Sequence, residues 1–167
     1  MGNFSEDKQE RAGFITFWLW LGIITNVISI PFSVIELNNI SNLGYIGMQL
    51  IAQGVDISPF RNAIDTPIHM LIGVTILSAI SYIWGYSLLL KWKKNGFFII
   101  VIGALINVIV NIVSYPMIQD AYFSIGLTVD YSTVKYVTLI GACFSIFILW
   151  MILQIKKSGV SYWSQLE

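Results

Sequence analysis

Four long apolar segments that contain no Asp, Glu, Lys or Arg constrain this chain more than any other feature. They cover residues 13–35, 66–90, 97–118 and 136–155. A helix rises about 1.5 Å per residue and a bilayer's hydrocarbon core is about 30 Å thick, so each segment can cross a membrane. We therefore expect an all-α integral membrane protein. Its single four-helix domain would span residues 13–157, with outer loops at 36–65 and 119–135 and terminal segments at 1–12 and 158–167.

The composition supports a membrane protein over a soluble domain. Hydrophobic residues make up 56% of the chain and charged residues 11%, against about a quarter charged in ordinary soluble domains. Nine basic residues balance nine acidic ones, so no basic field for nucleic acid is present. The single cysteine, Cys143, excludes an intrachain disulfide. The lipid bilayer is the partner that this composition predicts.

The basic residues are divided unevenly between the two expected sides of the membrane. Arg61 and Lys135 fall on one side, and seven fall on the other: Lys8, Arg11, Lys91, Lys93, Lys94, Lys156 and Lys157. Cytoplasmic loops carry an excess of Lys and Arg. We therefore expect a multi-pass protein of the inner (cytoplasmic) membrane with both termini in the cytoplasm.

Two matched motifs predict an internal duplication. Asn26-x-x-Ser29-x-Pro31 in the first span reappears as Asn111-x-x-Ser114-x-Pro116 in the third, 85 residues later. Lys93-Lys94-x-Gly96 after the second span matches Lys156-Lys157-x-Gly159 after the fourth. The lysines suit the negative end of a helix, and the glycines are expected to end it in a left-handed conformation. We expect two helical hairpins in a parallel pseudo-repeat, with an axis along the membrane normal.

The polar residues of this repeat form the candidate intramembrane site. Pro31 and Pro116 have no N–H, so each frees a carbonyl one turn earlier that hydrocarbon cannot satisfy. The polar side chains available nearby are those of Asn26, Ser29, Asn107, Asn111 and Ser114. They either hydrogen-bond the helices to one another, which we favour, or line a site for an ion or small solute.

A second candidate lies at the outer end of the second span. Asp65 and His69 are one helical turn apart and could act as a titratable pair, although a structural role at the water boundary is favoured. No metal-ligand spacing or phosphate-binding loop is present in the sequence. We expect neither a cofactor nor a metal.

The loops and the tail carry further local signals. Leu43, Ile46, Gly47, Leu50 and Ile51 share one face of a short amphipathic helix in the first outer loop. Asp65-Thr66-Pro67 predicts the start of the second span, because Asp caps a helix and Pro suits its first turn.

The last residues should fold back against the cytoplasmic end of the helices, because Tyr162 and Trp163 would otherwise expose apolar rings. Their pattern, Lys156-Lys157-x-Gly-x-Ser-x-Trp-x-x-Leu, resembles the tail of small uncharacterised four-span proteins of the bacterial inner membrane. The resemblance covers about a dozen residues. It implies location and size and no mechanism.

Three hypotheses for function follow. The favoured one is a non-enzymatic structural or accessory protein that acts by lateral association in the membrane, with itself or with another membrane protein. The alternative is an oligomeric channel or facilitator for a small solute or ion, built on the Asn-x-x-Ser-x-Pro pair. The third is an enzyme at the outer face, which would have to use Asp65, His69 and scattered loop carboxylates.

Overall fold

Four long apolar helices dominate the computed structural model, which describes residues 13–157 and 159–167. They are α1 (Gly13–Ser41), α3 (Ser58–Leu90), α4 (Asn95–Phe123) and α5 (Ser132–Leu153). The shorter elements are α2 (Gly44–Ala52), β1 (Lys156–Lys157), β2 (Val160–Ser161) and α6 (Tyr162–Gln165). All four long helices are long and apolar enough to cross a membrane, which confirms the predicted helical membrane class. Lys8 and Arg11 lie outside the described residues.

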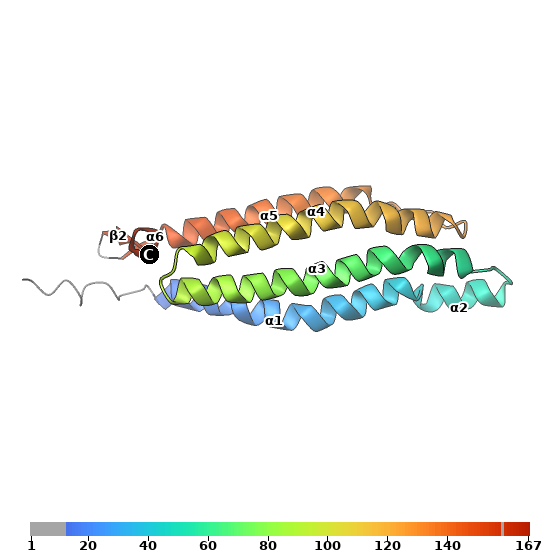
Figure 1. Ribbon diagram of the computed structural model, residues 1–167, viewed down its shortest axis with the longest axis horizontal. Coiled ribbons are helices and arrows are strands. Elements are labelled where there is room, and N and C mark those ends of the chain that lie inside the picture. The colour runs from blue at the N-terminus through green and yellow to red at the C-terminus, as the bar shows by residue number, and fades with distance from the viewer. Residues whose placement is uncertain (1–12, 158) are drawn as a thin grey trace, which may run out of the picture.

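The long helices run side by side along the longest axis of the molecule (Figure 1). The closest packing joins α3 to α4, while α1 packs on α3 and α5 packs on α4. The remaining seam, between α1 and α5, is packed more loosely than these three interfaces. The α3–α4 turn and the C-terminal segment lie at one end, which we call the inner end after the predicted topology, and α2 lies at the other, outer end (Figure 1).

The helix of the second span begins at Ser58 rather than at Thr66, so the predicted start at Asp65-Thr66-Pro67 is wrong. The Asp56 carboxylate accepts the Ser58 N–H at 2.9 Å, and this bond lowers the pKa of Asp56 below 3.8. Pro67 is consequently inside α3, where it is buried. At about 1.5 Å per residue the 33 residues of α3 span roughly 50 Å, so part of the helix must extend beyond the hydrocarbon core.

The first outer loop contains the predicted short helix, α2. Its buried face is formed by Leu43 and Gly47, whereas Ile46 and Ile51 are exposed, so the apolar face is narrower than expected. Leu43 packs in an outer core cluster with residues of α1, α3 and α4, among them Leu37, Phe60 and Ile118. Figure 1 shows α2 continuing along the long axis beyond α1.

The α3–α4 turn differs from the prediction in its use of glycine. Trp92, with a φ of 62°, takes the left-handed conformation, and Gly96 lies inside α4. A Cβ on Gly96 would stand 2.9 Å from the Leu89 nitrogen and would also meet the Gly85 carbonyl oxygen. Gly96 is therefore required for the close approach of α3 and α4. Gly159, with a φ of 85°, has the expected left-handed conformation, but it turns the chain between β1 and β2 and does not end α5, which stops at Leu153.

The C-terminal segment folds back under the inner end, as predicted. The Tyr162 hydroxyl donates to the Leu89 carbonyl, and the Glu167 N–H donates to the Trp92 carbonyl at 2.8 Å. The Lys94 ammonium lies 4.6 Å from the centre of the Trp163 ring, a cation–π contact. These contacts hold the C-terminal segment against the α3–α4 turn.

Candidate intramembrane polar site

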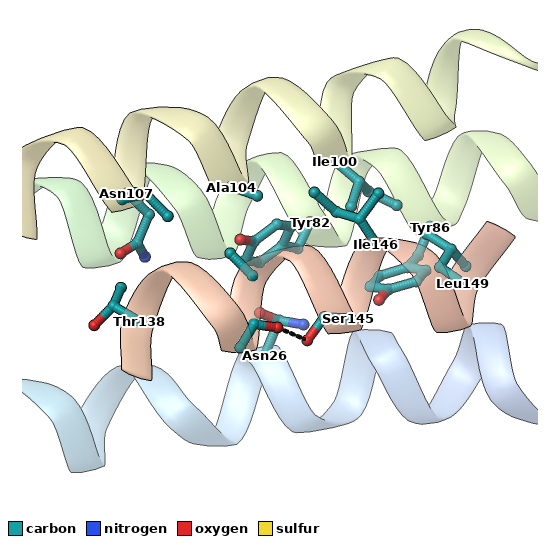
Figure 2. Close-up of a pocket in the computed structure, with 13 residues that line it drawn as sticks. Asn26, Tyr82, Tyr86, Ile100, Ala104, Asn107, Thr138, Ser145, Ile146 and Leu149 are labelled. Carbon is teal, nitrogen blue, oxygen red and sulfur yellow. Dashed lines mark hydrogen bonds between the residues drawn. The ribbon is translucent and has the colours of Figure 1, made fainter. Parts of the chain in front are cut away.

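A central cavity of about 340 Å³ lies among all four long helices. Its polar lining comes from Asn26 on α1, Tyr82 and Tyr86 on α3, Asn107 on α4, and Thr138 and Ser145 on α5. Figure 2 shows Asn26 and Ser145 pointing toward each other near the middle of the cavity, with Asn107 and Thr138 toward one end of it. Two of the predicted site residues, Asn26 and Asn107, therefore line one cavity together with polar residues of α3 and α5.

The cavity asparagines are held by hydrogen bonds. Asn26 donates to the Gly22 carbonyl, one turn earlier in α1, at 2.7 Å. Asn107 donates to the Ser78 hydroxyl across the α3–α4 interface at 3.0 Å, and Ser78 in turn donates to the Val74 carbonyl at 2.7 Å. Asn107 is therefore both a link between two helices and part of the cavity wall.

A second pocket, of about 200 Å³, lies nearer the outer end between α1, α3 and α4. Polar side chains form most of its wall: Ser33, Glu36, Thr75, Asn107, Asn111 and Tyr115. Leu37, Ile40 and Leu71 complete it. We call this the outer pocket. Asn107 lines both the outer pocket and the central cavity, so the two spaces adjoin.

An amide pair fixes the deep wall of the outer pocket. The Asn111 side-chain nitrogen donates to the Asn107 backbone carbonyl at 2.7 Å and also to the Asn107 side-chain oxygen. The Asn111 nitrogen uses both of its hydrogens in these bonds, whereas the Asn107 nitrogen keeps one after its bond to Ser78, so the pocket wall offers mainly oxygen atoms and one amide N–H. Tyr115 is held by a ring contact with Tyr131, with centroids 5.4 Å apart.

The inner end of the molecule is closed by an apolar cluster. Ile15 and Leu19 from α1, Leu89 from α3 and Leu153 from α5 are at most 1% exposed, and Tyr162 of α6 packs with them. The Tyr86 ring lies against Gly22, where an added Cβ would come within 2.6 Å of it. The polar spaces therefore stop short of the inner surface.

The rest of the predicted repeat site does not line these spaces. Ser29, Pro31 and Pro116 are exposed on the helix surfaces, and Ser29 donates to the Asn26 carbonyl at 2.9 Å. Ser114 is fully buried, and its hydroxyl has no hydrogen-bond partner among the described residues. The two motifs thus occupy different surroundings in the two helices.

Asp65 and His69 do approach each other, with His69 Nδ1 3.3 Å from Asp65 Oδ1 and 2.7 Å from the Asp65 carbonyl. Their side chains are 73% and 72% exposed, and neither lines the central cavity or the outer pocket. Across the ranges 13–157 and 159–167, no three His, Cys, Asp or Glu side chains lie close enough to hold a metal.

The basic residues expected to set the topology gather at the inner end. Lys91, Lys93 and Lys94 lie in the α3–α4 turn or beside it, and Lys156 and Lys157 form β1. Lys93 stands 3.5 Å from a Glu167 carboxylate oxygen. Arg61 lies near the start of α3, at the outer end.

The sequence motifs did not assign five of the lining residues to this site: Glu36, Thr75, Tyr115, Thr138 and Ser145. A periodic signal was present, because Asn107, Asn111 and Tyr115 recur every four residues and so share one face of α4. Which faces of α1, α3 and α5 meet this face of α4 depends on how the helices pack. Residue spacing within one helix does not show that.

Comparisons with protein families, with curated proteins and with solved structures find no match to this chain.

Proposed function

We propose that this protein binds a small solute inside the membrane and facilitates its movement from the outer side. The observation that carries the proposal is a pair of polar-lined spaces that share Asn107 as a common wall, one nearer the outer end and one among all four long helices. Unpaired polar groups are costly in hydrocarbon, so a polar-lined space among spanning helices favours a hydrated or ligand-filled site over lipid contact. Passage through the protein would require the inner apolar cluster to open.

Proteoliposome flux tests this function with three small probes: glycerol, urea and methylammonium. We expect at least one probe to cross faster than in protein-free liposomes, and Asn26→Leu and Asn111→Leu to remove most of the increase. These two residues suit the test because their amide nitrogens donate within their own helices, at 2.7 Å in each case. Ser29→Ala, on an exposed surface of α1, is the control. Rates equal to protein-free liposomes for all three probes would contradict the proposal.

The proposal includes a topology, a four-span bundle with both termini in the cytoplasm. The clustering of Lys91, Lys93, Lys94, Lys156 and Lys157 at one end supports it through the positive-inside rule. Reporter fusions at residue 167 and within the loop at 124–131 test it. The C-terminal fusion should report the cytoplasm and the loop fusion the opposite side, and the reverse result would exclude an outward-facing pocket.

A second candidate function, lateral association, is favoured by the loose seam between α1 and α5. Apolar grooves follow this seam and are lined by residues such as Trp18, Ile148 and Ile152. Gly141 of α5, which lines the central cavity beside this seam, has open space where a Cβ would stand, and small residues let helix backbones approach closely in membranes. We propose that a transmembrane helix of a second copy of this chain occupies the seam, which makes the protein a homo-oligomer.

Disulfide crosslinking in membranes tests the second candidate. Gly141→Cys combined with Cys143→Ser should form dimers on oxidation. The native exposed Cys143, two residues away on a different face of α5, should crosslink less. Equal crosslinking of the two proteins, or none for Gly141→Cys, would exclude association through the seam.

A further inference from the structure

The outer pocket combines one carboxylate with several neutral oxygen groups. We propose that it binds a small organic cation, a primary ammonium on a short aliphatic chain. This inference rests on the solute-binding function proposed above and names its ligand class. It concerns binding, so a binding measurement tests it independently of a flux measurement.

The charge of the lining is the first argument. Glu36 is the sole Asp, Glu, Lys, Arg or His among the nine residues that line the outer pocket. It has no ion-pair partner within the described part of the chain. Glu36 follows the first apolar segment directly, which puts it at the edge of the hydrocarbon. Glu36 is exposed in the structure, so its carboxylate is accessible to a cation from solution and attracts it by charge.

The second argument is the orientation of the hydrogen-bonding groups. The nitrogens of Asn107 and Asn111 are used in bonds to Ser78 and to Asn107. One N–H of Asn107 stays a donor, while the Asn111 oxygen and the hydroxyl oxygens of Ser33 and Thr75 can accept hydrogen bonds in the wall. An ammonium group has three donors and no acceptor, which matches a wall of oxygen atoms. Bonds that involve a charged group are also stronger than neutral ones.

The third argument is the size and shape of the pocket. Its volume of about 200 Å³ is far larger than a bare alkali ion needs, and it is smaller than the roughly 300–1,000 Å³ of sites for drug-sized ligands. Leu37, Ile40 and Leu71 provide an apolar wall beside the polar one. A short alkyl chain would pack against these side chains while its ammonium group faces Glu36 and the amide oxygen of Asn111.

Calorimetric titration of the purified protein in nanodiscs, at constant ionic strength, tests the inference with propylammonium as the probe. We expect saturable binding, with 1-propanol and Na⁺ binding at least about tenfold more weakly, the equivalent of about 1.4 kcal/mol for the loss of a charge-assisted contact. Glu36→Gln should weaken propylammonium binding by a similar factor. Asp120→Asn, at an exposed outer carboxylate that does not line the pocket, is the matched control and should bind like the native protein.

Glu36→Asp keeps the charge and should retain measurable binding, which protects the test if Glu36→Gln folds poorly. The inference is overturned if propylammonium does not bind the native protein, if 1-propanol or Na⁺ binds equally well, or if Glu36→Gln binds normally. Flux of glycerol without propylammonium binding would overturn the ligand class and leave the proposed function standing. Binding of propylammonium without flux of any probe would leave the ligand class standing and overturn the proposed movement of solute.

Discussion

Ser78 and Ser114 show how differently the same side chain can be satisfied within one membrane domain. Both are buried, at 4% and 0% exposure. The Ser78 hydroxyl accepts from Asn107 and donates to the Val74 carbonyl, whereas the Ser114 hydroxyl has no partner among the described residues. A buried polar group without a partner costs about 1–3 kcal/mol, so the two serines should contribute to stability with opposite signs.

Alanine substitution of these two serines tests this difference. We expect Ser114→Ala to stabilise the protein by about 1 kcal/mol, because it removes an unpaired hydroxyl. Ser78→Ala should destabilise it by about 1–3 kcal/mol, because the Asn107 amide loses its acceptor. Reversible unfolding of the purified protein in mixed micelles measures both. A loss of stability in Ser114→Ala equal to that in Ser78→Ala would show that Ser114 has a partner.

The hydrogen bond from the Ser58 N–H to Asp56, at the start of α3, should make stability depend on pH in the acid range. The hydrogen bond from Ser58 lowers the pKa of Asp56 in the folded state, so its contribution is fully present above 3.8 and is lost as the pH falls through the lowered value. Asp56→Asn keeps a capping oxygen and removes the titration. We expect the native protein to lose more stability than Asp56→Asn as the pH falls below 3.8, measured by unfolding at several pH values. Parallel curves would contradict the assignment.

At the scale of the helical elements, the close α3–α4 interface depends on positions without a side chain. Gly85 and Gly96 face each other there, and a Cβ on either would come within 3 Å of the other's backbone oxygen. Gly73 lies in α3 with open space around its missing Cβ. All three glycines are helical, but Gly85 and Gly96 lie against the neighbouring helix and Gly73 does not.

Alanine at these glycines should therefore have opposite effects. Gly96→Ala should destabilise the protein by about 1–3 kcal/mol, the range typical of overpacking. Gly73→Ala should be neutral or stabilising by up to about 1 kcal/mol, because alanine favours helix over glycine. Unfolding in mixed micelles measures both, and a stable Gly96→Ala protein with native spectroscopic properties would exclude the close approach described here.

The apolar segments predicted the existence and type of the long helices, because hydrocarbon requires every backbone group to be bonded within the segment. Their ends were harder to predict. Residues 58–65 are polar enough to lie outside the membrane and still continue α3, since a helix need not stop at the bilayer surface. Gly96 was assigned to a turn because glycine favours left-handed conformations, yet Trp92 takes that conformation and Gly96 serves packing.

The candidate site was predicted in part. Asn26, Asn107 and Asn111 stood out because amides are rare in apolar segments, and the structure places all three in the polar spaces. Glu36 and Thr75 did not, because their roles depend on which faces of α1 and α3 meet α4. The internal duplication stays a prediction, and Ser29 and Ser114 show that its two copies have different surroundings.

At the scale of the whole molecule, the two ends of the helices differ in character. The inner end contains a tightly packed apolar cluster, and the C-terminal segment folds against it. Only apolar grooves along the α1–α5 seam continue from the central cavity toward this end in the described part of the chain. The outer half contains a polar pocket beside α1, which adjoins the central cavity. This asymmetry supports the proposal that a solute enters from the outer side and that its passage requires the inner apolar cluster to open.

Labelling with a membrane-impermeant cationic thiol reagent tests that asymmetry most directly, using single cysteines in a Cys143→Ser background. Thiols react as thiolates, which form in water and are disfavoured in apolar surroundings. Asn111→Cys, in the outer pocket, should react when the reagent is added to the outer face of spheroplasts. Val113→Cys, two residues further along α4 on its exposed surface, should not. Equal reactivity of the two cysteines, or reaction of Asn111→Cys from the cytoplasmic face alone, would contradict an outward-open polar pocket.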